Sequence, residues 1–209
     1  MTAPSFTAKP VAARRYDPLV IKPSAGTLAG DHKVVATHDY NWRMPIQGDP
    51  DMQRLGEAVH SSFACDALIR SQARSVRLSK VHATLQRWSV TEIKADDVII
   101  AADRLWGFIA TTYPDAGWRT EVPLVSRLGD QLVKGRIDVL IEGDNWFAIL
   151  DHKSFRGARN ALESKALGYA PQLAIYARGV AEATAKQCRG MWVHMPVVGT
   201  LLQVGSTTV

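Results

Sequence analysis

The chain has 209 residues, 46% of them hydrophobic, and a formal net charge of +5. This composition suits one domain, or one domain plus an arm, with a core that needs no disulfide staples. Two cysteines, Cys65 and Cys188, are too few for a four-cysteine zinc or iron–sulfur site, and no apolar run approaches the roughly 18 residues that cross a bilayer. We therefore expect a cytoplasmic protein with no iron–sulfur cluster and no membrane partner, and the basic balance is consistent with a nucleic-acid partner.

Prolines set the first fifty residues apart, because six of the ten prolines fall there. Long helices are excluded from such a stretch. A short strand or hairpin is expected around Val34–Ala36, Tyr40 and Trp42, and the residues before about Asp17 have the composition of a linker. We expect residues 1–50 to form an N-terminal arm or linker and residues 51–209 to form the main domain.

The main domain is expected to contain both helices and strands, because apolar residues recur first at helical spacing and later in short β-branched runs. The predicted helices are Leu55–Ala73, about Leu78–Trp88, Asp96–Thr112 and about Pro171–Lys186. The predicted strands are about Trp118–Ser126, Val133–Glu142, Trp146–His152, Gly190–His194 and Leu201–Val204.

Two of these strands carry acidic residues that are expected to meet. The turn-forming residues 142–145 join the strands into a β-hairpin, which brings Asp138 close to Asp151. Side chains alternate along a strand, so Asp151 and Lys153 point the same way and His152 points to the other face. The sequence thus predicts two carboxylates and a lysine at one place.

This set of groups is suited to phosphodiester hydrolysis. Magnesium prefers carboxylate and carbonyl oxygens, so two aspartates and one backbone carbonyl are a sufficient protein contribution. A lysine beside the metal can stabilise the phosphate or orient the attacking water. Each residue also has an ordinary interpretation, since aspartates often close strands and a lysine after a strand is usually solvated.

Further candidates lie outside the hairpin. Gln172 and Tyr176 are four residues apart and share one helix face, where they can hold a DNA phosphate, orient the lysine, or simply pack. Basic residues follow the hairpin and are expected to clamp the substrate backbone: Arg156, Arg159 and Lys165. A second basic set, Arg70, Arg74 and Arg77, fits either DNA contact or a solvated helix face.

Five short motifs, taken in order, resemble those of the RecB-type nuclease domain of the PD-(D/E)XK superfamily. In the bacterial recombination helicase-nucleases of the AddA/RecB-like, UvrD-family type, this domain lies at the C-terminus. The motifs are a helical segment with a histidine, a strand-opening segment, a GxxD element, a D-x-K element and a QxxxY element. In the same order, these motifs occupy Leu55–His60, Glu121–Pro123, Gly135–Asp138, Asp151–Lys153 and Gln172–Tyr176.

The resemblance implies an α/β fold with a restriction-endonuclease-like core, in which helices flank a mixed central sheet. It implies a Mg²⁺- or Mn²⁺-dependent DNA exonuclease of repair or recombination that acts on single-stranded ends. The metal ligands would be His60, Asp138, Asp151 and the backbone carbonyl of His152, and Lys153 would position or activate water.

The resemblance leaves some roles and alternatives open. Glu121 would lie near the metal or DNA, or would bind a basic side chain. The chain would be a stand-alone relative or the C-terminal part of a protein with a helicase motor. Alternatives to the nuclease are a catalytically silent DNA-binding module of a helicase-nuclease complex and a site-specific restriction-type endonuclease.

Overall fold

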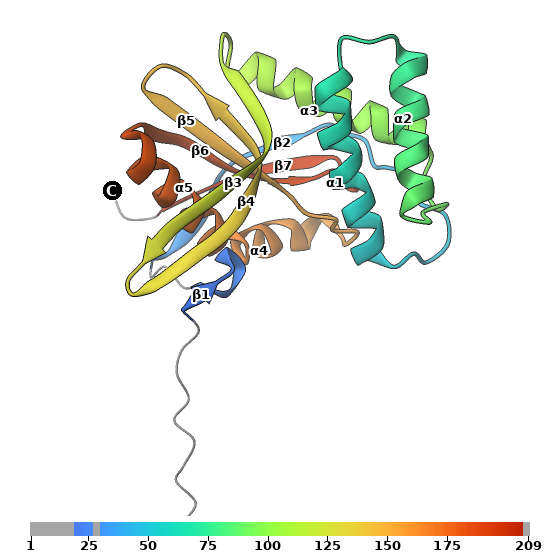
Figure 1. Ribbon diagram of the computed structural model, residues 1–209. Coiled ribbons are helices and arrows are strands. Elements are labelled where there is room, and N and C mark those ends of the chain that lie inside the picture. The colour runs from blue at the N-terminus through green and yellow to red at the C-terminus, as the bar shows by residue number, and fades with distance from the viewer. Residues whose placement is uncertain (1–18, 27–29, 207–209) are drawn as a thin grey trace, which may run out of the picture.

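A seven-stranded mixed sheet lies between two layers of helices (Figure 1). The computed structural model describes residues 19–26 and 30–206. The strand order is β1-β4-β5-β6-β7-β2, and β3 pairs with the other edge of β4. The strands are β1 Val20–Ile21, β2 His32–Asp39, β3 Gly117–Leu128, β4 Gln131–Glu142, β5 Trp146–His152, β6 Gln187–Met195 and β7 Thr200–Ser206.

The edges of β4 are occupied unequally. One edge pairs with β3 along its whole length. The other edge pairs in parallel with β1 at Leu132 and Val133, and antiparallel with β5 from Val139 to Glu142. Among the described residues, β4 therefore has no strand partner on this edge over residues 134–138, and this gap becomes important for the site.

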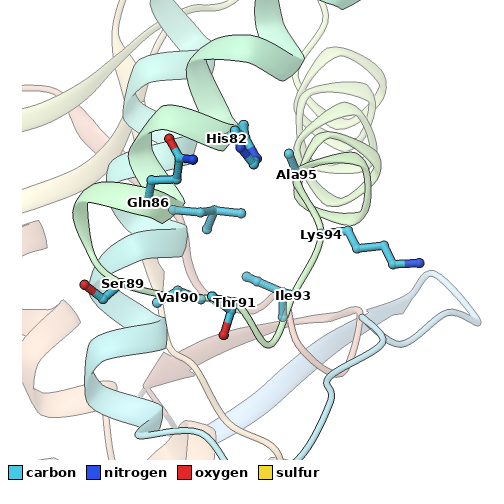
Figure 2. A pocket seen from close by; sticks show the side chains of 9 residues that line it. His82, Gln86, Ser89, Val90, Thr91, Ile93, Lys94 and Ala95 are labelled. Carbon is cyan, nitrogen blue, oxygen red and sulfur yellow. The ribbon is translucent and has the colours of Figure 1, made fainter.

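Three helices cover one face of the sheet, and two cover the other (Figure 1). The first layer contains α1 (Met52–Ile69), α2 (Arg74–Arg87) and α3 (Ala95–Thr112), and the second contains α4 (Leu162–Leu167) and α5 (Ala170–Thr184). Asp51 caps α1 by accepting hydrogen bonds from the N–H groups of Gln53 and Arg54, which satisfies donors that the first helical turn leaves free. A cavity of about 680 Å³ lies between the end of α2 and the start of α3 (Figure 2).

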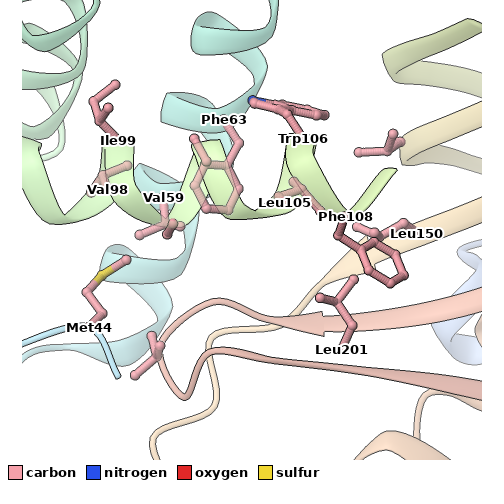
Figure 3. Packing of buried hydrophobic residues seen from close by; sticks show 14 of the residues in the cluster. Met44, Val59, Phe63, Val98, Ile99, Leu105, Trp106, Phe108, Leu150 and Leu201 are labelled. Atoms are coloured by element: carbon pink, nitrogen blue, oxygen red, sulfur yellow. The ribbon is translucent and has the colours of Figure 1, made fainter. Parts of the chain in front are cut away.

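The alternation of side chains along the strands builds a separate core on each face. Val139, Ile141 and Leu150 belong to one core cluster with Phe63 and Trp106 of the α1–α3 layer. Figure 3 shows Leu150, Phe63 and Trp106 in this cluster. The intervening residues Leu140, Phe147 and Ile149 pack against α4 and α5. Because both faces are covered where β4 and β5 pair, residues 139–141 of β4 and 147–150 of β5 are apolar and buried.

The expected α/β fold is confirmed: helices flank a mixed central sheet. The predicted helices and strands of the main domain are all present, with ends that differ by a few residues, and β5 has the bounds predicted for it. The short helix α4 was not anticipated, since its six residues carry too few turns for a clear periodicity.

Part of the expected N-terminal arm belongs to the sheet. β2 is a single edge strand that pairs with β7, and Tyr40 and Trp42 follow it and pack on the α1–α3 core. The two residues of β1 pair with β4. The boundary expected at residue 51 therefore falls inside one structural unit, whereas residues 1–18, which include the expected linker, lie outside the described residues.

The expectation that Arg77 faces DNA or solvent is wrong. The guanidinium of Arg77 is buried and donates to both carboxylate oxygens of Asp66, at 2.7 and 2.9 Å, and to Asp103 at 2.6 Å. Arg74 pairs with Asp96 and Asp103 at the surface. These basic residues therefore join α1, α2 and α3 to one another.

In the described part of the chain, no helix is both long enough and apolar enough to cross a membrane.

Candidate active site

The candidate site lies where β4 and β5 separate. Their pairing ends at Val139 and Leu150, while β5 continues beside β6 as far as the pair His152–His194. Asp138 and Asp151 are the next residues of β4 and β5 beyond the last pair. The fork thus places both carboxylates together at the gap on the edge of β4.

Asp138 is held by β5 and approached by α1. Its Oδ2 accepts a hydrogen bond of 2.6 Å from the backbone N–H of His152 and lies 3.7 Å from Nδ1 of His60. Gly56, one turn before His60, lets α1 come this close, because a Cβ at this position would lie 2.9 Å from Oγ of Ser154. The structure thus brings the predicted histidine to the predicted aspartate.

Asp151 is contacted by the predicted lysine and the predicted glutamine. Its Oδ2 lies 2.7 Å from Nζ of Lys153, and its Oδ1 accepts a hydrogen bond of 3.1 Å from Nε2 of Gln172 on α5. Nζ of Lys153 also lies 4.9 Å from the ring centroid of Tyr169, a cation–π contact that the sequence did not indicate. These contacts fix the direction of the ammonium group.

His152 presents its backbone and its ring to different surroundings, as the strand alternation predicted. Its carbonyl oxygen lies 2.8 Å from Nε2 of His60. Its imidazole is buried and contacts the rings of Phe63 and His194 on the α1 side of the sheet. His152 therefore contributes its backbone N–H and carbonyl to the site, whereas its ring lies in the core.

The charges of the site are not balanced. Burial, and next the negative charge of Asp151, raise the pKa of Asp138 to about 7, although His60 and the hydrogen bond from His152 oppose the shift. Burial disfavours the charge on Lys153, but its contact with Asp151 outweighs this, so the pKa of Lys153 is raised and the group remains a cation. Asp151 thus has the cation of Lys153 beside it, whereas the ionised form of Asp138 is destabilised.

Replacement of Asp138 by asparagine is expected to stabilise the metal-free protein in a pH-dependent way. The folded pKa of Asp138 lies above that of the unfolded chain, so its ionisation costs stability as pH rises from about 4 through 7. The gain from Asp138→Asn should be about 2 kcal/mol larger at pH 8 than at pH 5. Urea unfolding in EDTA measures this difference, with the exposed turn variant Asp130→Asn as the control. An equal gain at both pH values would contradict the prediction.

The donor groups fit a hard divalent cation. They comprise two carboxylates, one of them without a full counter-charge, a backbone carbonyl and an imidazole, which is a combination that magnesium or manganese accepts. Within residues 19–26 and 30–206, however, no three His, Cys, Asp or Glu side chains converge as metal ligands. The ammonium group of Lys153 contacts Asp151 and compensates the negative charge that a bound metal ion would otherwise compensate.

Glu121 extends the acidic row across a third strand. The β3–β4 register places it opposite Asp138, and its φ of 56° lies in the left-handed region, which is strained for a residue other than glycine. Its carboxylate pairs with Arg136 at 2.7 Å. The structure contains the contact with a basic side chain and also places Glu121 beside Asp138, so a role near the metal or DNA stays a prediction.

Two predicted residues are less directly involved. Arg156 donates to the carbonyl of Gly48 and pairs with Asp49, and Arg159 pairs with Asp39. Both arginines therefore tie the segment after β5 to the segment after β2. That these arginines also clamp the substrate backbone stays a prediction.

A cavity of about 500 Å³ opens beside Asp138, and Trp88 lines it together with Glu57, His60 and Glu121. No motif marked Trp88, whose indole N–H donates to Oγ of Ser61. The larger cavity of Figure 2 is lined by no carboxylate and by none of the predicted site residues. Unlike the cavity of Figure 2, the cavity at Asp138 thus adjoins the candidate catalytic residues.

His194 is a second buried histidine, which no sequence motif marked. Its Nδ1 lies 2.9 Å from Nδ1 of His152, and one of the two nitrogens must donate while the other accepts. Burial lowers the pKa of His194 to about 3 and lowers the pKa of His152 well below its usual range. Both rings are therefore neutral in the folded protein.

This neutral pair is expected to make the fold sensitive to acid. The unfolded chain takes up protons on these histidines below pH 6.5 and the folded chain does not, so their contribution is complete above that pH and decreases toward pH 3. Between pH 7.5 and 5, His194→Asn should lose about 2 kcal/mol less stability than the wild type. Urea unfolding at both pH values provides the test, and equal losses would show that His194 does not control the acid response.

A family model of the PD-(D/E)XK nuclease superfamily matches residues 36–207. Among solved structures, a "Putative exonuclease" from Eubacterium rectale is similar, with a TM-score of 0.41, 14% sequence identity and coverage of 78% of this chain. The likeness spans 61% of that protein's chain and says nothing about activity, and a search of the curated proteins found no significant match. Because the family model covers most of the sequence, the chain belongs to the PD-(D/E)XK nuclease superfamily.

Proposed function

We propose that the protein is a Mg²⁺- or Mn²⁺-dependent deoxyribonuclease that hydrolyses single-stranded DNA from its ends. The observation that carries the proposal is the fork of β4 and β5, where Asp138, Asp151 and Lys153 lie together next to His60. PD-(D/E)XK nucleases generally use divalent metals such as Mg²⁺. In this chain the metal would be held by Asp138, Asp151, His60 and the carbonyl of His152.

The protein's own groups would each do a defined part of the reaction. Bound metal would neutralise phosphate charge and lower the pKa of water. Asp151 would orient Lys153, whose ammonium group would stabilise the charge that develops on the phosphate or hold the attacking water. Gln172 would fix the second oxygen of Asp151 through its hydrogen bond. His60, carried by α1, would complete the ligand set.

The order of the motifs also supports placement in the RecB-type branch, which acts in DNA repair and recombination. There, a helicase in the same chain or complex would deliver the single strand to the nuclease. This part of the proposal predicts stronger degradation of duplex DNA when a helicase unwinds it than when the nuclease acts alone.

The decisive experiment is a cleavage assay with end-labelled single-stranded and double-stranded DNA in Mg²⁺, Mn²⁺ or EDTA. Metal-dependent shortening of the single strand would support the proposal and would give the polarity from the labelled products. Tight binding without cleavage in either metal would instead favour a catalytically silent DNA-binding module. Discrete fragments from a plasmid would favour a site-specific endonuclease.

A further inference from the structure

A basic cavity of about 400 Å³ lies next to the fork, at the part of β4 that has no strand partner on that edge. Three cationic side chains line it, together with two hydroxyls and one amide. The cations are Lys22, Lys134 and Arg136, the hydroxyls belong to Ser24 and Tyr176, and the amide belongs to Gln172. No aspartate or glutamate is among its lining residues.

The cations of this basic cavity are available for a ligand. Lys22 and Lys134 are exposed, and neither forms an ion pair with another described residue. The side chain of Arg136 is 66% exposed and pairs with Glu121 on the active-site side. Arg136 also lines the cavity beside Asp138, so it stands between the two cavities.

The floor of the basic cavity is rigid and connected to the catalytic residues. A Cβ at Gly135 would lie 2.6 Å from the ring of Pro23 and 2.9 Å from the hydroxyl of Tyr176, so the glycine is needed for this close packing. Gln172 lines the cavity and donates to Asp151. A group bound here would therefore lie next to the phosphate that is cleaved.

We propose that the basic cavity binds an internal phosphodiester group of the single-stranded DNA substrate, adjacent to the cleaved one. This inference rests on the proposed function and deepens it by adding a second contact with the strand. Two free ammonium groups and a guanidinium, without a carboxylate in the lining, match one or two phosphate charges. Lys22 comes from the segment before β2, so docking of β1 on β4 completes the substrate site.

The test is the binding of a fluorescent single-stranded oligonucleotide in EDTA, with Lys153→Ala as the parent so that no cleavage occurs. The variant Lys22→Ala with Lys134→Ala should raise the Kd about tenfold at low salt, because two phosphate contacts are lost. The slope of log Kd against log salt should also fall by about 1.

Two control variants make the result specific. Lys33→Ala with Lys80→Ala removes the same charge from exposed lysines on β2 and α2, away from the basic cavity, and should leave the Kd within about twofold of the parent. Lys22→Arg with Lys134→Arg keeps both charges and should retain binding. Equal losses in the alanine pair and in the distant control would overturn the proposal.

The same titration separates an internal phosphate from a terminal one. Oligonucleotides with a 5′-phosphate or a 5′-hydroxyl should lose affinity equally in the Lys22/Lys134 variant. A loss confined to the 5′-phosphorylated strand would overturn the assignment to an internal group. If the wild type degrades DNA and the Lys22/Lys134 variant binds DNA normally, the subsite is refuted and the nuclease assignment stands. If the variant binds DNA weakly but the wild type degrades no DNA, the subsite stands and the nuclease assignment is refuted.

Discussion

Alanine at Lys153 is expected to lower the rate of single-strand cleavage by about a hundredfold to a thousandfold, the range seen when one preorganised charge-stabilising donor is removed. Nζ of Lys153 lies 2.7 Å from Asp151 and over the ring of Tyr169. The substitution removes the cation at the fork while leaving the carboxylates and His60 in place. The reduction should therefore appear mainly in kcat, measured under saturating DNA.

Lys165 offers a matched control for this experiment. Its ammonium group lies 5.7 Å from the ring centroid of the same Tyr169 but, among the described residues, forms no ion pair with Asp138 or Asp151. Because Lys165 is expected to contact only the substrate backbone, Lys165→Ala should keep kcat near the wild-type value under saturating DNA. Metal titration by calorimetry should show that Lys153→Ala still binds Mn²⁺, because no proposed ligand is altered. Normal turnover in Lys153→Ala would remove this lysine from the mechanism.

Alanine at Asp66 is expected to have the largest effect on stability, about 3–5 kcal/mol, because it leaves the buried guanidinium of Arg77 with only a partial counter-charge. Asp66 is fully buried and also accepts a hydrogen bond from the indole N–H of Trp106. Asp103, which is 43% exposed in its side chain, remains as the second partner of Arg77. Urea unfolding at neutral pH measures the loss.

The surface ion pair between Arg74 and Asp96 supplies the comparison. Both side chains are about half exposed, so Asp96→Ala should cost about 1 kcal/mol or less. A double variant with Asp66→Leu and Arg77→Met removes the buried pair as a unit and should cost less than Asp66→Ala alone, since no buried charge is left. If Asp66→Ala costs no more than Asp96→Ala, the buried network does not hold α1 to α2 and α3.

The sequence was most informative where structure depends on short-range periodicity. The two-residue repeat of β5 showed that Asp151 and Lys153 share a face and that His152 faces the other way, and both hold in the fold. The hairpin residues joined β4 to β5 and so brought Asp138 to Asp151. These features depend on neighbours within about fifteen residues, where backbone geometry leaves few choices.

Charged residues were harder to place from sequence. Arg74 and Arg77 are three residues apart on α2, yet Arg77 is buried between α1 and α3 while Arg74 pairs at the surface. Arg156 and Arg159 lie beside the motif lysine but pair with residues before position 50. A guanidinium reaches several partners, and which one is near depends on contacts distant in the chain.

By itself, then, the sequence determined the mixed α/β class, the hairpin that carries the two aspartates and the lysine, and the motif order of the superfamily. Only the tertiary structure decided that β1 and β2 join the sheet, that Glu121 pairs with Arg136, that His152 and His194 share a buried contact, and that Lys22 lies beside Lys134. Except for the Glu121–Arg136 pair, which joins the neighbouring strands β3 and β4, each of these depends on segments far apart in the chain packing together. Local propensity and spacing contain no information about such pairings, because the chain makes them only when its hydrophobic layers close.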